Sequence, residues 1–316
     1  MIFWILGGIL AFLIIAFLII LIYCFKKVFY YEKQKPLGEN EYGITKDGFF
    51  EKHYDQVIEW IKQCRSLPYE EVEITSFDGL KLRGKYYECQ KGAPIEIMFN
   101  GYKGYAERDM SGGIERCFRL GRNALLVNQR ACGDSEGKVH TFGINEKKDC
   151  LKWVDFCIEK FGKDCQLILT GISMGGATVL LASRESLPQN VKYTLADCSY
   201  SSAKEVICKT IDEMNLPSKL LFPFVKLSGK VFGKFNVEED TPINAAANAT
   251  VPIILFHGDK DTIVPYEMST KLYDACKTQK YLYTVKDCDH GFAYPEDKEG
   301  YLNAIKEFEQ KIGFEY

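Results

Sequence analysis

One short segment constrains the fold of this chain more than any other. Residues 167–178 read Leu-Ile-Leu-Thr-Gly-Ile-Ser-Met-Gly-Gly-Ala-Thr, an apolar run typical of a buried strand followed by small residues typical of a helix. The chain must reverse between the two at Ser173, and this reversal strains the backbone of the serine. Side chains two positions away must lack bulk, as Gly171 and Gly175 do. The segment predicts a nucleophile elbow with Ser173 Oγ beside the N-terminus of a helix.

A nucleophilic serine needs a base and an acid that orients the base. In elbow folds the acid follows the serine along the chain, and the histidine follows the acid. We predict Asp261 as the acid, just beyond an apolar strand at 251–256, and His290 as the base, just beyond a strand at 280–285. Both stand past the carboxyl ends of strands, where open parallel sheets hold their ligands. The alternative, an incidental serine in a glycine-rich turn, would leave this arrangement unexplained.

Other residues compete for the roles of base and acid. His53 lies upstream in an amphipathic stretch and is expected to be an exposed helix residue. His140 follows a glycine-rich loop, but it precedes the serine. His257 is expected to make a buried hydrogen bond that shapes the loop of the acid. Asp197 is the main alternative acid, because a carboxylate one strand after the serine can reach the same histidine.

The motifs stand in an order that resembles the alpha/beta-hydrolase superfamily over roughly residues 70–316. Within it the chain looks like the bacterial membrane-anchored serine hydrolases of the dienelactone-hydrolase and prolyl-oligopeptidase-like branch. The resemblance implies an α/β fold with a mostly parallel sheet, helices on both faces and a helical cap insertion. It also implies cleavage of an ester or thioester. The motifs are Asn100-Gly101-Tyr102, residues 129–137, Gly171–Gly175, His257–Pro265 and Asp289-His290-Gly291.

The expected oxyanion donors are two backbone N–H groups. The elbow makes the N–H of Met174 one donor, and the N–H of Tyr102, after a strand at 95–99, is the natural second. The chain departs from the superfamily at Asn100, where histidine is usual, and at Asn128–Ala131, where Asp-x-Arg-Gly is usual. The first departure leaves the donor intact, because that donor is a backbone group. Acyl transfer through a serine needs no cofactor and no metal, so neither is expected.

The N-terminus predicts a membrane anchor. The run from Ile2 to Phe25 carries no charged residue, and at about 1.5 Å per residue it can cross a hydrocarbon core of about 30 Å. A cleaved signal peptide is the alternative, but a basic n-region and a small-x-small cleavage site are lacking. Positive residues remain inside, so a single-pass anchor with a cytoplasmic catalytic domain is expected. The lysines behind this orientation are Lys26, Lys27, Lys33 and Lys35.

Cysteine usage and charge limit the partners. Twelve cysteines are scattered without any C-x-x-C, whereas a secreted protein would be expected to organise them as disulfides. We therefore expect them to be reduced, and we expect no metal at Cys150, Cys157 and Cys165. A net charge of −3 gives no reason to expect a nucleic-acid partner. The expected substrate is a small-molecule or lipid-like acyl compound.

Strand and helix patterns alternate after the N-terminal region. We expect a membrane anchor at 1–25, a linker with an amphipathic helix at 26–69, and a hydrolase domain at 70–316. The amphipathic helix is expected at 49–67, because its apolar positions fall at helical spacing.

An apolar insertion at about 199–248 shows no strand pattern. Three helices are expected in it, broken by Pro217 and Pro223. The insertion stands where this fold carries its cap, so residues such as Phe222 and Phe224 are expected either to roof an acyl site or simply to pack on the sheet. Two other functions remain open: a peptidase of the prolyl-oligopeptidase-like branch, and a catalytically silent binding module tethered to a membrane.

Overall fold

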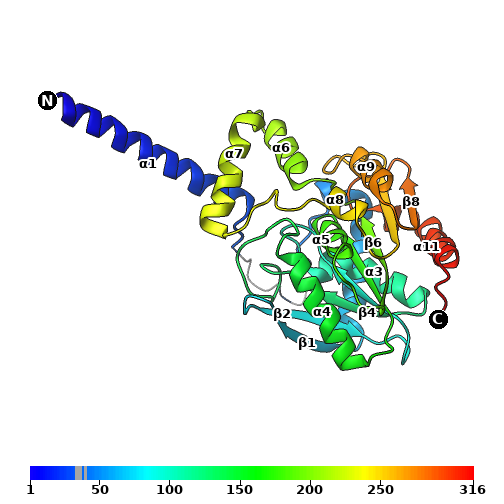
Figure 1. Ribbon diagram of the computed structural model, residues 1–316. Helices are drawn as coiled ribbons and strands as arrows, with labels where there is room; N and C mark the ends of the chain where they lie inside the picture. The colour runs from blue at the N-terminus through cyan, green and yellow to red at the C-terminus, as the bar shows by residue number, and fades with distance from the viewer. Residues whose placement is uncertain (33–37, 39–40) are drawn as a thin grey trace.

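A computed structural model describes residues 1–32, 38 and 41–316 (Figure 1). Its centre is an eight-stranded sheet in the order β1-β2-β4-β3-β5-β6-β7-β8. Strand β2 runs antiparallel to both neighbours, and the strands from β4 to β8 run parallel. The strands are β1 (Glu70–Thr75), β2 (Lys81–Tyr87), β3 (Ile95–Phe99), β4 (Asn123–Val127), β5 (Leu167–Ile172), β6 (Val191–Asp197), β7 (Ile253–Gly258) and β8 (Lys280–Val285).

Helices cover both faces of the sheet, and they bury a hydrophobic core on each side. One face carries α4 (Glu146–Phe161), α5 (Met174–Ser183), α8 (Pro242–Ala247) and α9 (Glu267–Ala275). The other carries α2 (Tyr54–Ser66), α3 (Ala106–Arg119), α10 (Ala293–Glu296) and α11 (Lys298–Ile312). Strands β3 and β4 are buried at every position, as expected for parallel strands with two covered faces. The expected α/β fold is confirmed.

The amphipathic stretch before the sheet packs on α3. It begins as a 3₁₀ turn, η1 (Gly48–His53), and continues as α2, whereas the sequence predicted one helix from 49. Trp60 on α2 packs closely on Gly112 of α3, since a Cβ on Gly112 would lie 2.8 Å from the indole ring. The predicted linker is partly outside the described residues, including the positions of Lys33 and Lys35.

Helix α1 (Ile2–Val28) is long and apolar enough to cross a membrane, and Figure 1 shows it projecting away from the sheet. Its last turns meet the folded part of the chain. Directly after α1, Tyr30 forms an isolated antiparallel bridge with Val139, and the N–H of Tyr31 donates to the carbonyl of Lys138 at 2.8 Å. The end of the helix is thereby fixed to the loop that precedes α4.

The insertion forms helices α6 (Ala203–Glu213) and α7 (Ser218–Ser228), a π turn η2 (Gly229–Gly233) and α8. Pro223, where the sequence suggested a break, lies inside α7, which runs on into η2. Helix α8 was not predicted from the sequence, although Thr241 caps it and Pro242 occupies its first turn, a pairing typical of helix starts. Helix α7 packs along the last turns of α1 (Figure 1).

Candidate active site

The turn between β5 and α5 has the geometry of a nucleophile elbow. Ser173 adopts φ 56° and ψ −116°, a strained conformation for a residue other than glycine. A Cβ on Gly171 would lie 2.1 Å from the backbone of Gly175, and a Cβ on Gly175 would lie 2.0 Å from the carbonyl oxygen of Phe99. Both glycines are therefore required by backbone contacts. The N–H of Ser173 donates to the carbonyl of Asp197 at 2.8 Å, which ties the elbow to the next strand.

Three side chains meet at this elbow. His290 Nε2 lies 2.9 Å from Ser173 Oγ, and His290 Nδ1 lies 2.6 Å from Asp261 Oδ2. The side chain of Asp261 is fully buried. Its second oxygen accepts hydrogen bonds from the N–H groups of Ile263 and Val264, at 2.9 and 2.7 Å. Burial alone would raise the pKa of Asp261, but hydrogen bonds from His257 and His290 lower it to about 2.

This network assigns the hydrogens on His290. The ionised carboxylate of Asp261 can only accept, so Nδ1 carries the proton and Nε2 is free to accept from the hydroxyl of Ser173. A hydroxyl whose proton points at an unprotonated imidazole nitrogen is prepared for proton transfer.

The structure separates the two candidate acids. Asp197 Oδ2 accepts a hydrogen bond from the hydroxyl of Tyr301 at 3.0 Å, and burial raises the pKa of Asp197 to about 6. The ion pair of His290 is made with Asp261. Asp197 therefore stands beside the elbow without orienting the histidine.

The other histidines have structural roles. His257 Nε2 lies 2.9 Å from the carbonyl of Val264 and 3.0 Å from Asp261 Oδ2, so it shapes the acid loop as expected. His53 was expected to be exposed, but its side chain is only 12% exposed and pairs with Glu296 at 3.0 Å. Its ring also packs on Phe292. A 3₁₀ turn directs it inward, where the sequence pattern had suggested an outer helix face.

His140 is fully buried near the end of α1. Its ring lies 5.6 Å from that of Tyr31 and 5.3 Å from that of Tyr102. Burial, together with the nearby Lys103 ammonium, lowers the pKa of His140 to about 3. The imidazole is therefore neutral at physiological pH, and it takes no part in the contacts of Ser173.

Of the two residues predicted to supply the oxyanion donors, Tyr102 lines the same pocket as the serine, and Met174 follows the serine in the chain. The loop after β3 brings Tyr102 to the wall of a pocket that also contains Ser173 and His290. Met174 is the first residue of α5, so its N–H belongs to the free donors of a helix N-terminus. Beside Tyr102, the N–H of Gly101 donates to Asp109 at 3.0 Å, which fixes the loop. The hydroxyl of Tyr102 donates to the carbonyl of Val28 at the end of α1, at 2.6 Å.

A polar network supports this loop from behind. Gln129 donates from its backbone N–H to Asn100 Oδ1 at 3.0 Å and from Nε2 to the carbonyl of Asn100 at 2.6 Å. The hydroxyl of Thr178 on α5 donates to Gln129 Oε1 at 2.9 Å. Asn100 in turn donates to the carbonyl of Gly101 at 2.8 Å. Asn100, where histidine is usual, and Gln129 thus form one connected unit between the elbow helix and the oxyanion loop.

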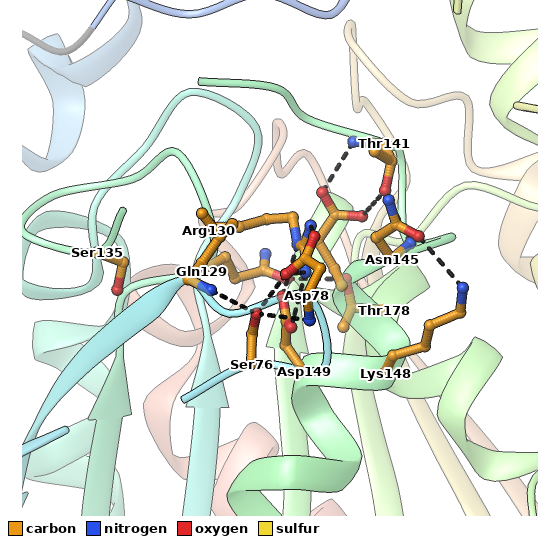
Figure 2. Close-up of polar contacts among 12 residues, drawn as sticks. Ser76, Asp78, Gln129, Arg130, Ser135, Thr141, Asn145, Lys148, Asp149 and Thr178 are labelled. Carbon is orange, nitrogen blue, oxygen red and sulfur yellow. Dashed lines mark hydrogen bonds and ion pairs between the residues drawn. The ribbon is translucent and has the colours of Figure 1, made fainter. Parts of the chain in front are cut away.

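Arg130 links the loop after β4 to the β1–β2 turn and to α4, as Figure 2 shows. Its guanidinium contacts both oxygens of Asp149 on α4, at 2.7 and 2.8 Å, and pairs with Asp78 in the β1–β2 turn at 2.9 Å. The next residue, Ala131, has φ 63°, in the left-handed region that favours glycine. Alanine thus stands where glycine is usual, at a position whose backbone conformation favours glycine.

The pocket beside Ser173 has a volume of about 350 Å³ and mostly apolar walls. It opens between η1, α2, α3 and the segment after His290, and its aromatic walls include Phe49, Phe50, Trp60 and Phe292. No residue of 199–248 is among its lining residues. The insertion, for which the sequence left open a roof over an acyl site or packing on the sheet, does not line this pocket. Phe222 packs in the core beneath α7, and Phe224 packs against Phe17 of α1.

Two buried polar groups interrupt the apolar walls of the pocket. Arg116 Nε and Asp197 Oδ1 have no hydrogen-bond partner in the described part of the chain. Arg116 is otherwise paired through its terminal nitrogen with Glu96.

One cluster has the composition of a metal site. Ligand atoms of Cys198, Asp261 and His290 lie within 4.8 Å of one another. Burial raises the pKa of the Cys198 thiol well above its usual range, so the thiol is protonated, whereas metals bind the thiolate. Asp261 and His290 are already bonded to each other. All twelve cysteines are free, in accord with the expected reduced state.

The chain resembles known hydrolases in sequence and fold. The sequence profile of the prolyl oligopeptidase family matches residues 139–313. The uncharacterized protein YqkD of Bacillus subtilis is 27% identical over 190 residues, which cover 60% of this chain and 62% of YqkD. The thiohydrolase aneE of Aspergillus aculeatus is 34% identical over 118 residues, or 36% of this chain and 37% of aneE. Both matches thus span less than two thirds of the relatives.

Solved structures show the same fold. The Pyrococcus furiosus esterase Pf2001 superimposes with a TM-score of 0.66 at 22% identity, and the match covers 89% of this chain and 98% of the esterase. The profile match, which extends over more than half of the chain, agrees with that fold and with the elbow. The chain belongs to the prolyl oligopeptidase family, within the alpha/beta-hydrolase superfamily.

Proposed function

We propose that this protein is a serine hydrolase that cleaves an ester or thioester through an acyl-enzyme on Ser173. One observation carries the proposal: the continuous hydrogen-bonded line from Ser173 Oγ through His290 to the buried carboxylate of Asp261, with separations of 2.9 and 2.6 Å. The esterase and the thiohydrolase among the similar proteins support an acyl substrate. A fold alone would not carry this step, since similar folds host many functions.

The chemistry follows from these positions. His290 Nε2 takes the hydroxyl proton as Ser173 Oγ attacks the substrate carbonyl, and Asp261 stabilises the imidazolium. The N–H groups of Tyr102 and Met174 stabilise the oxyanion, and removal of one such donor typically costs about 3 kcal/mol. The protonated His290 then gives its proton to the leaving alcohol or thiol. Water, activated by the same histidine, hydrolyses the acyl-enzyme and regenerates the serine.

The pocket between α2 and α3 is the proposed acyl site. It is continuous with Ser173, its walls are largely aromatic, and its volume of about 350 Å³ lies at the lower end of the range of small-molecule sites. An acyl group of moderate length fits this description better than a peptide, for which a row of backbone hydrogen-bonding partners would be needed. We therefore favour esterase or thioesterase activity over peptidase activity.

A probe and two variants test the proposal. Ser173→Ala is expected to abolish both hydrolysis of p-nitrophenyl esters and labelling by a fluorophosphonate, with almost no change in melting temperature. Asp261→Asn is expected to lower kcat by about four orders of magnitude, because the histidine loses the partner that sets its tautomer. Asp197→Asn is the matched control, since Asp197 is also buried near the elbow but bonds Tyr301. Labelling retained in Ser173→Ala would refute the nucleophile.

We further propose that α1 anchors the protein in a membrane and that the hydrolase domain faces the cytoplasm. The length and apolar composition of α1 support the anchor, and Lys26 and Lys27 in its last turn support the orientation. A reporter that is active only outside the cytoplasm, fused after Tyr316, is expected to be silent. The same reporter, fused to a variant with Lys26→Glu and Lys27→Glu, tests whether these lysines set the orientation.

A further inference from the structure

Helix α7 has apolar residues on two faces. One face is buried against the insertion and α1, through Phe222 and Val225. The other carries Leu220, Phe224, Leu227 and Val231, spaced by four, three and four residues, so they share one side of the helix and its continuation into η2. Of these, Leu220 is 64%, Leu227 38% and Val231 53% exposed. We call Leu220, Phe224, Leu227 and Val231 the outer stripe.

The outer stripe continues the apolar surface of α1. The ring of Phe224 lies 5.8 Å from that of Phe17, and Phe232, also exposed, lies 5.5 Å from Phe25. Phe17 stands eight residues before Phe25, which corresponds to about 12 Å along a helix. Since Lys26 begins the basic end of α1, the contact with Phe17 lies on the part of α1 that the proposed anchor places in the bilayer.

Lysines border the outer stripe. Lys219, Lys226 and Lys230 recur at spacings of seven and four residues along α7 and η2, on a side next to the stripe. Lys226 also pairs with Glu238 at 2.5 Å. An apolar face with basic residues beside it is typical of helices that lie in the membrane interface, where lysines meet anionic headgroups. A protein partner would have no reason to match the apolar surface of α1 as well.

We propose that the outer stripe of α7 is a membrane-binding surface, which rests in the boundary between headgroups and acyl chains beside α1. This inference rests on the proposed anchoring by α1. It gives the hydrolase domain a second attachment to the same leaflet, and so a fixed orientation relative to the bilayer. A single helix joined to a domain does not by itself fix that orientation.

Photo-cross-linking in a bilayer tests the proposal. The full-length protein, with p-benzoylphenylalanine in place of Leu220 or Val231, is placed in nanodiscs that contain anionic and zwitterionic lipids. Position Leu10, exposed on α1, reports whether the anchor is in the bilayer, and position Lys152, on the distant α4, is the control for the soluble surface. Lipid adducts are identified by mass spectrometry. Melting curves establish that each variant is folded.

Lipid adducts at Leu220 and Val231 comparable with those at Leu10, and absent at Lys152, are the expected result. Adducts at Leu10 alone would overturn the proposal and leave the anchor standing. A cross-linked dimer through Leu220 would mean that a second copy of the chain covers the outer stripe, which also overturns it. No adduct at Leu10 would instead refute the anchor. The double variant Lys219→Gln and Lys230→Gln is expected to lose any dependence of the Leu220 adduct on anionic lipid.

Discussion

Helices α2 and α7 both present apolar residues beyond their own cores, but they do so toward different surroundings. Helix α2 and the preceding turn wall the pocket beside Ser173, through residues such as Phe49 and Trp60. Helix α7 packs on α1 and contributes nothing to that pocket. The sequence suggested the reverse, with the segment before the sheet as a linker helix and the insertion as a possible roof.

The difference shows that composition does not decide which surface an apolar segment covers. Both segments carry apolar residues at helical spacing. Trp60 packs over Gly112 of α3, and Phe224 packs against Phe17 of α1. Each contact depends on a distant partner in the sequence. The pocket side and the anchor side of the molecule should therefore respond differently to substitutions.

The largest expected effect is on the anchor side. Phe222 on α7 is 4% exposed and belongs to the core shared with α1. Phe222→Ala should lower the free energy of unfolding by about 3 to 5 kcal/mol, as truncation of a buried phenylalanine does. The ratio of kcat/KM for long-chain esters over acetate esters should stay unchanged. Melting curves and chain-length profiles measure both, with exposed Leu220→Ala as the control. A selective loss of long-chain activity would restore the insertion as a roof.

A smaller but selective effect is expected on the pocket side. Phe49 lines the pocket although it is 45% exposed. Phe49→Ser should lower kcat/KM for long-chain esters by about tenfold or more relative to acetate esters, since one lost apolar contact is worth about 1 to 3 kcal/mol. Phe77→Ser is the matched control, because Phe77 is 43% exposed but lies over Arg130. Equal loss for all chain lengths would mean that the pocket does not hold the acyl group.

His140, which lies between the end of α1 and the loop that carries Tyr102, should make the free energy of unfolding depend on pH. Its pKa is about 3 in the folded protein, below the ordinary value of 6.5. Between these two values the unfolded chain binds a proton at His140, whereas the folded chain does not. The stability present at pH 7 is therefore lost as pH falls from 6.5 toward 3, by about 1.4 kcal/mol per unit and about 2 kcal/mol at pH 5.

The variant His140→Leu isolates this contribution. Neither ring nitrogen of His140 has a hydrogen-bond partner within the described residues, so leucine removes the titration without breaking a hydrogen bond. Unfolding measured at several pH values should show a shallower acid slope for the variant. If the two slopes coincide, His140 is protonated in the fold or exposed to water.

The hydrogen bond between Tyr102 and the end of α1 should affect turnover less than the substitutions above affect stability or selectivity. Tyr102→Phe removes the hydrogen bond to the carbonyl of Val28, worth about 1 kcal/mol. We expect kcat to fall severalfold with KM unchanged, because the loop that carries an oxyanion donor loses its tie to α1. Tyr105→Phe is the control, since Tyr105 makes an equally short bond, 2.6 Å, to the carbonyl of Tyr42 and not to α1. Equal effects of the two variants would make the tie to α1 unimportant.

Local signals in the sequence gave much of the fold and the proposed triad. The elbow, the strands around it and the positions of Asp261 and His290 follow from glycine spacing, apolar runs and chain order, which are properties of a few neighbouring residues. The strands at 95–99 and 280–285 have the expected bounds. The sequence favoured Asp261 over Asp197 by chain order, and the structure adds the contacts of each carboxylate: Asp261 bonds His290, and Asp197 bonds Tyr301.

Features that depend on distant contacts were missed. The inward position of His53 requires Phe292 and Glu296, which come more than two hundred residues later. The packing of α7 against α1 joins segments about two hundred residues apart in the sequence. The pocket wall at Phe49 depends on how η1 meets the segment after His290. Propensity and periodicity report none of these contacts.

The smallest expected effect on the free energy of unfolding is at Ala131, which lines neither the pocket nor the surface of α7. Its φ of 63° places Cβ against the backbone, a strain of about 1 to 2 kcal/mol for a residue other than glycine. Glycine loses about 0.5 to 1 kcal/mol more conformational freedom on folding, so Ala131→Gly should raise the free energy of unfolding by about 0.5 kcal/mol.

Ala124→Gly provides the contrast, since Ala124 is buried in β4 without a positive φ and should lose stability on the same change. Ala131→Gly should alter neither the chain-length profile nor the lipid adducts of α7, because its loop is held by Arg130 and lines neither surface. Chemical denaturation of the two variants in detergent gives the comparison. If both glycine variants are destabilised alike, the backbone of Ala131 is not strained, and alanine in place of the usual glycine carries no penalty here.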